Sequence, residues 1–223
     1  DGLRLGRSDA YFLVDLQPEV KREAARALAR LGGHGVRYVE RAMANLEHRT
    51  LFNRTIVTSE LLATLGRERA IAEQGAMDPV VAQRLRSGFD LSCDEYDAML
   101  RRHAAMKTEA AAEMADLDAW VAPTIAVAAP PLLETLEPEK GSALAAHLTR
   151  NTGPMNMFGQ CGFSMPIQSR DARLPVGLQI TCSGFEEEKA LSIALALENA
   201  LGAPVMPDMT PFTGAWTPAL GMP

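Results

Sequence analysis

The sequence is poor in cysteine and has no pattern that would use its cysteines together. Its 223 residues include three cysteines, which are odd in number and widely spaced, without a CxxC pair or a nearby histidine cluster: Cys93, Cys161 and Cys182. This pattern excludes a disulfide framework and offers no zinc-ligand spacing. The four histidines are also dispersed, with no His-x-x-x-His pair. We therefore expect a reduced, cytoplasmic protein without a metal site.

The sequence also lacks blocks of like charge and long apolar runs. The 28 acidic and 22 basic residues give a net charge of −6 and are interspersed, so no basic surface is predicted for nucleic acid. The longest uncharged apolar stretch, Ala119 to Leu133, contains three prolines and falls short of the ~20 residues that a membrane-spanning helix needs. The chain opens at Asp1 without methionine or an apolar leader, which indicates an interior start and no secretion signal.

What the sequence does contain is enough apolar material for one sizeable core, since 47% of the residues are hydrophobic and 22% are charged. The beginning reads as strand, helix, strand. A short strand at Leu3–Gly6 precedes a helix from Pro18 to Leu31, in which apolar residues recur every three or four positions. An alternating segment, Gly35–Glu40, follows the glycines that end this helix. Such a unit predicts two parallel strands joined by a helical crossover.

The middle of the sequence is predicted to be helical. Three runs between Asn53 and Met114 are separated by breaks at Gly75–Pro79 and Gly88–Ser92. Ser92, followed three residues later by Glu95, is a capping-box signature for the third run.

The last third returns to mixed structure. A strand at Leu117–Thr124 enters a proline-rich loop that reaches Pro138, and a helix is predicted from Glu139 to about Arg150. The stretch Asn151–Pro166 mixes glycine, proline and small polar residues, and we expect a turn-rich path there rather than a plain strand or helix. A buried strand, Pro175–Cys182, and an amphipathic helix, Glu186–Leu201, complete the pattern.

Several short motifs occur in a characteristic order along the whole chain. They are Leu3-Arg4-Leu5-Gly6, Pro18-Glu19-Val20, Leu31-Gly32, Glu60, the run Asp118 to Thr124, the run Thr152 to Asn156, Gly159, Pro166, and the run Leu174 to Ile180. In this order and spacing the sequence resembles the C-terminal half of the amidase-signature family, which includes amidases and the A subunit of the glutamyl-tRNA amidotransferase. The resemblance implies an α/β fold with a mixed sheet flanked by helices. Residues 1–223 would be the C-terminal portion only.

The resemblance also implies a reaction, the hydrolysis of a small carboxamide to a carboxylic acid and ammonia without a metal or cofactor. In this family a Ser–cis-Ser–Lys triad performs acyl transfer, and it lies in the N-terminal half. No Gly-Gly-Ser-Ser run occurs here, and none of the lysines Lys21, Lys107, Lys140 and Lys189 lies in a matching motif. We therefore assign no catalytic residue, and we expect the chain to need the N-terminal amidase half, on the same or another chain, for activity.

Five positions match motifs next to the family's substrate pocket: Thr124, Thr152, Met155, Asn156 and Cys161. Two of them also have a purely structural interpretation. Asn156 would either face the substrate or satisfy backbone groups in an irregular loop. Thr124 stands at the end of a strand, where it would either line a ligand site or cap the strand.

The segment Thr149-Arg150-Asn151-Thr152 departs from the tRNA amidotransferase pattern, which has an aspartate there for the free amino acid substrate. This departure argues against a glutamine-directed member. Arg150 would either hold a carboxylate or interact with the end of the preceding helix as a solvated charge.

Two other functions remain open at this stage. A catalytically inactive scaffold would bind through the sheet edge that a missing half leaves uncovered, either to another chain or to a second copy of itself as a homodimer. A cysteine-dependent hydrolase would use Cys161 within Gly159-Gln160-Cys161-Gly162, but Phe163 stands where a nucleophile elbow needs glycine, so a buried structural cysteine is favoured.

Overall fold

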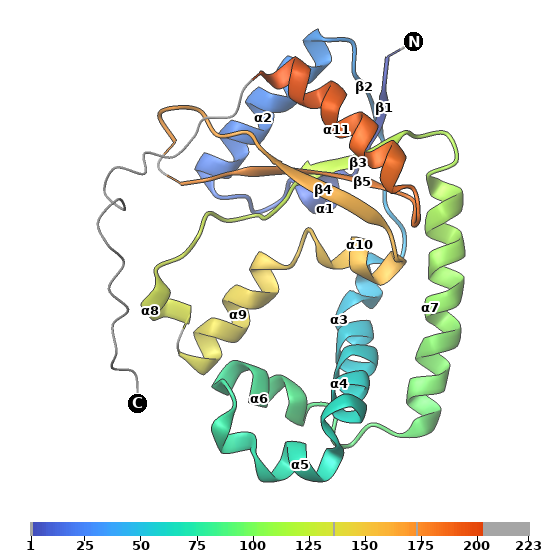
Figure 1. Cartoon of the computed structure of the whole chain (residues 1–223), viewed down its shortest axis with the longest axis vertical. Helices are drawn as coiled ribbons and strands as arrows, with labels where there is room; N and C mark the ends of the chain where they lie inside the picture. The colour runs from blue at the N-terminus through green and yellow to red at the C-terminus, as the bar shows by residue number, and fades with distance from the viewer. Residues whose placement is uncertain (1, 136, 173, 203–223) are drawn as a thin grey trace.

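A five-stranded mixed sheet organises the chain in this computed structural model, which describes residues 2–135, 137–172 and 174–202 (Figure 1). Its strand order is β2-β1-β3-β5-β4. The strands are β1 (Arg4–Arg7), β2 (Arg37–Glu40), β3 (Ala119–Pro123), β4 (Cys161–Pro166) and β5 (Gly177–Cys182). β1 runs parallel to both β2 and β3, whereas β5 is antiparallel to both β3 and β4. The predicted α/β class with a mixed sheet is confirmed.

The first unit of the sheet is the predicted strand, helix, strand. The short helix α1 (Asp9–Phe12) and the long helix α2 (Pro18–Gly33) connect β1 to β2. Pro18 occupies the first turn of α2, where its missing N–H leaves no hydrogen bond unmade. The helix continues through both glycines, and the chain reverses at Gly35, whose φ of +91° favours glycine. The predicted parallel pairing is therefore confirmed, with α2 ending two residues later than expected.

The middle of the chain is helical, as predicted. Its elements are η1 (Leu46–His48), α3 (Arg49–Phe52), the π-helical turn η2 (Asn53–Val57), α4 (Thr58–Leu65), α5 (Arg67–Ala72), η3 (Gln74–Ala76), α6 (Pro79–Arg86) and α7 (Cys93–Glu113). The capping box forms, because the Ser92 hydroxyl accepts from the Glu95 N–H at 3.2 Å and the Glu95 carboxylate accepts from the Ser92 N–H at 2.9 Å. A further break falls at Gly66, whose φ is +81°.

The stretch Asn151–Pro166 was predicted wrongly as an irregular path. It contains a helix, α10 (Gly153–Phe158), followed directly by β4. The residues that suggested turns stand at element boundaries: Pro154 lies in the first turn of α10, and Gly159 ends it in the left-handed conformation. The remaining helices are α8 (Leu132–Thr135), within the proline-rich segment, α9 (Pro138–Leu148) and α11 (Glu187–Leu201).

Each face of the sheet carries its own hydrophobic core. On one face, α2 and α11 pack over side chains of β1, β3, β4 and β5 (Figure 1). On the other face, Trp120 and Ala122 of β3 pack against α7, α10 and the segment around α3. Trp120 is 1% exposed and anchors this second core. The sheet is thus covered on both faces near β3.

One face of the sheet is no longer covered by helices at the outer strand, β4. β4 pairs only with β5 among the described residues, and its side chains alternate, so that Gly162, Ser164 and Pro166 are exposed. On the same face, Gln179 and Thr181 of β5 are buried at 6% and 2% exposure. The sheet therefore passes from a covered centre to an open edge within a single strand, and this is where the cavity described next lies.

Candidate functional site

A cavity of about 220 Å³ lies where the carboxyl end of β3 meets α10 and the partly uncovered face of β4 and β5. Its lining comes from these elements and the residues that flank them: Thr124, Thr152, Met155, Asn156, Gln160, Gly162, Phe163, Ser164, Gln179 and Thr181. None of these residues carries a charge. The polar side chains of the lining are therefore hydroxyls and carboxamides.

Two neighbouring hydroxyls line the cavity, one from Thr124, which follows β3, and one from Ser164 of β4. Thr124 Oγ1 and Ser164 Oγ are 2.6 Å apart, and the Thr124 N–H donates to the Gly177 carbonyl at 2.9 Å. A Cβ on Gly177 would lie 2.5 Å from Ser164 Oγ and 2.6 Å from Thr124 Oγ1, so only glycine fits beneath the pair. Thr124 thus both lines the cavity and links the end of β3 to β4.

The buried residue Asn151 fixes the relation between α10 and the sheet. Its Nδ2 donates to the Pro123 carbonyl at 2.8 Å and to the Phe12 carbonyl at 3.4 Å, and its own carbonyl accepts from Gln179 Nε2 at 3.0 Å. Asn151 is fully buried. One side chain and its backbone therefore tie α1, the end of β3 and the middle of β5 to the start of α10.

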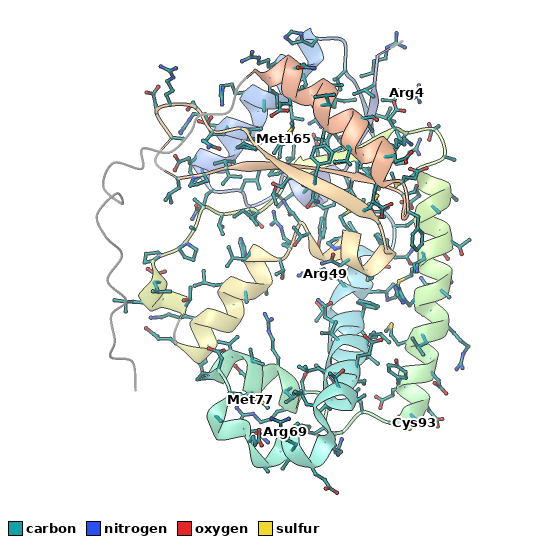
Figure 2. The ribbon with its side chains drawn as sticks, in the orientation of Figure 1. Arg4, Arg49, Arg69, Met77, Cys93 and Met165 are labelled. Atoms are coloured by element: carbon teal, nitrogen blue, oxygen red, sulfur yellow. The ribbon has the colours of Figure 1, made fainter. Side chains whose placement is uncertain are left out.

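The wall of the cavity is α10, which presents Thr152, Met155 and Asn156. Met155 is buried, whereas Asn156 is exposed. The helix is held from outside by two neighbours. Arg49 lies against Gly153 (Figure 2) and donates to the Thr149 carbonyl at 3.2 Å. His103 Nε2 donates to the Met157 carbonyl at 2.6 Å.

The structure brings four of the five expected positions together and separates the fifth. Thr124, Thr152, Met155 and Asn156 line the cavity. Cys161 lies on the face of β4 opposite to Gly162 and Ser164, where it packs with Met165 against the core under α2 and α11. Its thiol donates to the Ser183 carbonyl at 3.1 Å. This placement argues against Cys161 as a nucleophile in the cavity.

Six cavity residues escaped the sequence interpretation: Gln160, Gly162, Phe163, Ser164, Gln179 and Thr181. Ser164 pairs with Gln179 and Gly162 with Thr181 across the antiparallel strands, which places these four on one face. The alternation of Gln179 and Thr181 with apolar residues was the available signal. The prediction of a buried strand at Pro175–Cys182 is confirmed by β5, but it assigned no face of the sheet to these two polar residues.

Arg150 does not belong to the lining of the cavity. Arg150 Nη2 donates to the Val14 carbonyl at 2.6 Å, and Arg150 Nε donates to Asn151 Oδ1 at 3.2 Å. Two N–H groups of the half-buried Arg150 guanidinium are therefore used in holding the fold.

The part of the chain that the structure describes contains neither a metal-binding cluster nor a membrane-spanning helix. Within residues 2–135, 137–172 and 174–202, no three His, Cys, Asp or Glu side chains gather in a way that could hold a metal ion. None of the helices described there combines the length and the apolar character needed to cross a membrane.

The three cysteines are free and differ in accessibility, which gives a direct labelling prediction. Cys93 is exposed at the start of α7 (Figure 2), Cys161 is half-buried and Cys182 is fully buried. Burial raises the pKa of the Cys182 thiol from 9.0 to about 11, which lowers its thiolate fraction at neutral pH about a hundredfold. In timed iodoacetamide labelling followed by peptide mass spectrometry, we expect Cys93 to react first and Cys182 only on unfolding.

The control for this experiment is labelling in urea, where all three thiols should react at similar rates. Fast modification of Cys161 or Cys182 in the native protein would contradict the burial and the hydrogen bonding described above.

Comparison with known proteins now decides the family. A model of the family described as Amidase matches residues 1–191. The chain belongs to the amidase family. Solved structures support the fold: a crystal structure of an amidase superposes with a TM-score of 0.74 at 22% identity, over 91% of this chain and 47% of that one. A 6-aminohexanoate cyclic dimer hydrolase with bound substrate superposes with a TM-score of 0.71 at 22% identity, over 91% and 46%.

Curated relatives of this amidase-family chain are longer than it is. A 2-amino-5-chloromuconic acid deaminase from Comamonas testosteroni is 31% identical over 206 residues, which covers 90% of this chain and 44% of the relative. The A subunit of the glutamyl-tRNA(Gln) amidotransferase from Geobacter sp. (strain M21) is 27% identical over 221 residues, covering 89% and 45%. The amidase-family chain thus spans less than half the length of these relatives.

Proposed function

We propose that this chain forms one wall of an active site that hydrolyses a small carboxamide, with water, to a carboxylic acid and ammonia. The observation that carries the proposal is the neutral, polar cavity at the open edge of the sheet, in a chain of the amidase family. Thr124, Thr152, Met155 and Asn156 would contact the substrate there. Cys161 would act only from behind the sheet, as part of the core that supports β4.

The reacting groups would come from elsewhere. The hydroxyls of Thr124 and Ser164 form a hydrogen bond with each other. No residue that lines the cavity is a base that could take a proton from either hydroxyl. A serine or threonine hydroxyl attacks a carbonyl only when such a base lies within hydrogen-bond reach. The nucleophile and its base are therefore assigned to the N-terminal amidase half, on the same polypeptide or on another.

Two exposed features support a partner at this side of the molecule. The outer edge of β4 has no strand beside it among the described residues, and an open edge of this kind pairs readily with a further strand. On α11, Leu191 and Leu195 are 67% and 62% exposed, although the opposite side of that helix is buried. Apolar side chains exposed one helical turn apart mark a surface suited to contact with another element.

The test is to produce the complete gene product that carries this sequence and to measure ammonia release from a panel of linear amides. Intact mass under denaturing conditions shows whether the triad-bearing half is on the same polypeptide. We expect activity in the complete product and none in residues 1–223 alone. A complete product that contains the Gly-Gly-Ser-Ser stretch and releases no ammonia from any amide would overturn the proposal. A product of about 24 kDa that binds another protein or a second copy, without chemistry, would favour the scaffold function instead.

We further propose that the protein works in the cytoplasm. The three free cysteines support this assignment, because a reducing compartment keeps such thiols unpaired. Fractionation of cells that express the complete gene product from its own start would test this assignment.

A further inference from the structure

Two carboxamides of the cavity have hydrogen-bonding capacity that the described chain leaves unused. Gln160 donates from Nε2 to the sulfur of Met114 at 3.1 Å, which is a weak acceptor. Its Oε1 is buried and accepts no hydrogen bond, and it alone has this status among buried side-chain oxygens and nitrogens in residues 2–135, 137–172 and 174–202. Asn156 is exposed, and its side chain makes no hydrogen bond to any of these residues.

An unpaired buried carbonyl needs a physical explanation, because native proteins pair nearly all such groups. Leaving this oxygen without a partner destabilises the fold, and a methionine or leucine of similar volume would remove the defect. Gln160 is among the residues that line the cavity, so a turn of its buried carboxamide toward the cavity would bring Oε1 within reach of an N–H donor on a bound molecule. Polar groups that are kept although they destabilise the fold are typical of functional sites.

The two carboxamides are held on one rigid turn. Gly159 ends α10 in the left-handed conformation, its N–H donates to the Asn156 carbonyl at 3.2 Å, and the Gln160 N–H donates to the Met155 carbonyl at 3.0 Å. Asn156 therefore lies in the last turn of α10 and Gln160 directly before β4, with the turn at Gly159 between them. Such a turn presents both side chains to the same ligand at little cost in conformational entropy.

The cations nearest to this turn stay outside the lining. Lys107 lies beside Gly159, where an added Cβ would be 3.2 Å from its Nζ, and Arg49 lies beside Gly153 with its guanidinium bonded to the Thr149 carbonyl. Neither residue belongs to the lining of the cavity. A carboxylate bound in the cavity would therefore meet neutral amides and hydroxyls from this half, and a bare hydrocarbon chain would leave those groups unpaired.

We propose that Gln160 and Asn156 select amide substrates whose acyl group ends in a neutral hydrogen-bonding group, such as a second carboxamide, over those that end in a carboxylate or a hydrocarbon. An N–H of that terminal group donates to Gln160 Oε1, and its carbonyl accepts from Asn156 Nδ2. This inference rests on the proposed function, because it names the substrate class of the same cavity.

The experiment uses the complete gene product and three amides of matched length: pentanediamide, 5-amino-5-oxopentanoate and hexanamide. We expect kcat/KM for the diamide to exceed the other two by about tenfold or more, as for sites that hydrogen-bond a substrate group. In Gln160→Met and Asn156→Leu, the ratio of diamide to hexanamide kcat/KM falls about tenfold. Thermal unfolding provides a second measurement: Gln160→Met raises Tm, because the unpaired oxygen is gone.

Lys107→Met is the control, and it should leave both the preference and the activity unchanged. A preference for the carboxylate that disappears in Lys107→Met would overturn the inference in favour of charge recognition. An unchanged ratio in both Gln160→Met and Asn156→Leu would also overturn it, as would a lower Tm in Gln160→Met. These outcomes can be told apart from failure of the proposed function. If the enzyme hydrolyses hexanamide or other amides without preferring the diamide, the substrate preference is wrong but the amidase activity is retained.

Discussion

Asn151→Asp is expected to destabilise the protein by about 3 kcal/mol or more, although it changes a single atom type. The Nδ2 of Asn151 donates to two buried carbonyls, those of Pro123 and Phe12. A carboxylate offers only acceptors, so it would face both carbonyl oxygens without a proton between them. Because the residue is fully buried, water cannot relieve this contact. The same change loosens the start of α10, and we expect lower kcat/KM in the complete gene product.

The measurement is urea unfolding of the complete protein, with Asn53→Asp as the matched control. Asn53 is exposed, so the same chemical change there should alter the free energy of unfolding by less than about 0.5 kcal/mol. The penalty at position 151 should shrink at low pH, since a protonated carboxyl regains an O–H donor. Equal stability of the two variants at neutral pH would contradict the role assigned to Asn151.

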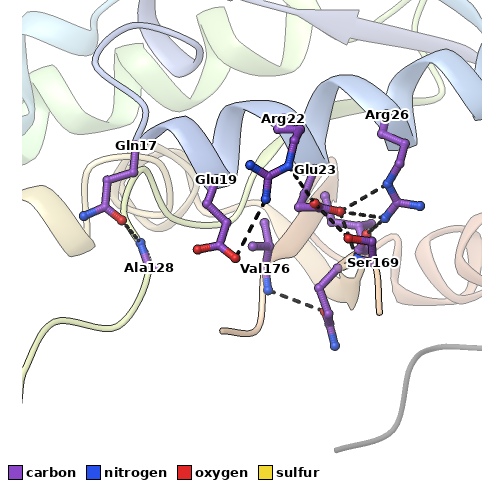
Figure 3. A network of polar contacts seen from close by, with 10 residues as sticks. Gln17, Glu19, Arg22, Glu23, Arg26, Ala128, Ser169 and Val176 are labelled. Atoms are coloured by element: carbon purple, nitrogen blue, oxygen red, sulfur yellow. Dashed lines mark hydrogen bonds and ion pairs between the residues drawn. The ribbon is translucent and has the colours of Figure 1, made fainter. Parts of the chain in front are cut away.

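Glu23→Gln is expected to cost about 2–3 kcal/mol, the range for charged hydrogen bonds of a buried group. The Glu23 side chain is 2% exposed and lies at the centre of the network in Figure 3. It accepts from the Ser169 N–H at 2.9 Å, from the Ser169 hydroxyl at 3.0 Å and from Arg26 Nη2 at 2.8 Å. Arg26 also donates to the Ile167 carbonyl. The network therefore fastens the loop after β4 to α2.

The stabilisation by Glu23 has a defined pH dependence. Burial alone would raise the pKa of this carboxyl, but the hydrogen bonds from Ser169 and Arg26 lower it below the ordinary value of 4.5. A carboxyl with a lowered pKa in the folded state stabilises that state fully above its ordinary pKa, and the contribution is lost as the pH falls through the folded value. The difference in Tm between wild type and Glu23→Gln should thus be constant from pH 8 to pH 6 and shrink below about pH 4.5.

The control for Glu23 is Glu73→Gln. Glu73 pairs with Arg69 at 3.1 Å, but their side chains are 52% and 68% exposed. Surface pairs of this kind contribute 0–1 kcal/mol, so the Tm should move little at any pH. A Tm difference for Glu23→Gln that grew as the pH fell would contradict the hydrogen bonding proposed for this carboxylate.

Local signals in the sequence predicted the helices that begin at characteristic residues. Pro18 at the start of α2 and the Ser92 and Glu95 pair at the start of α7 both act within one turn of the chain. The prediction for the segment with α10 and β4 was wrong, because its local signals do not mark the start of one long element. Its glycine and proline mark boundaries between two short elements, and short elements owe their conformation to packing that sequence alone does not display.

The cavity was predictable only in part. Thr124, Thr152, Met155 and Asn156 follow from motif order, because each stands within a short run of matching residues. Ser164, Gln179 and Thr181 join them through the register of β4 against β5, in which Ser164 faces Gln179. Shifting β4 by one residue against β5 would turn Ser164 to the other face of the sheet, away from Gln179 and Thr181, and nothing local in the sequence fixes this register. Asn151 was equally hidden, because its partners lie 28 and 139 positions away.

The order of strands in the sheet has a consequence for how the chain reaches its native topology. β4 and β5 are neighbours in sequence and can form a hairpin early, whereas Arg4 and Asp118, which join β1 to the start of β3, are 114 positions apart. The entropy of closing so long a loop rises only with the logarithm of its length, about 0.6 kcal/mol for each doubling. Extra residues in the helical block between β2 and β3, added outside the helices that pack on Trp120, would therefore raise the entropic cost of pairing β1 with β3 only slightly.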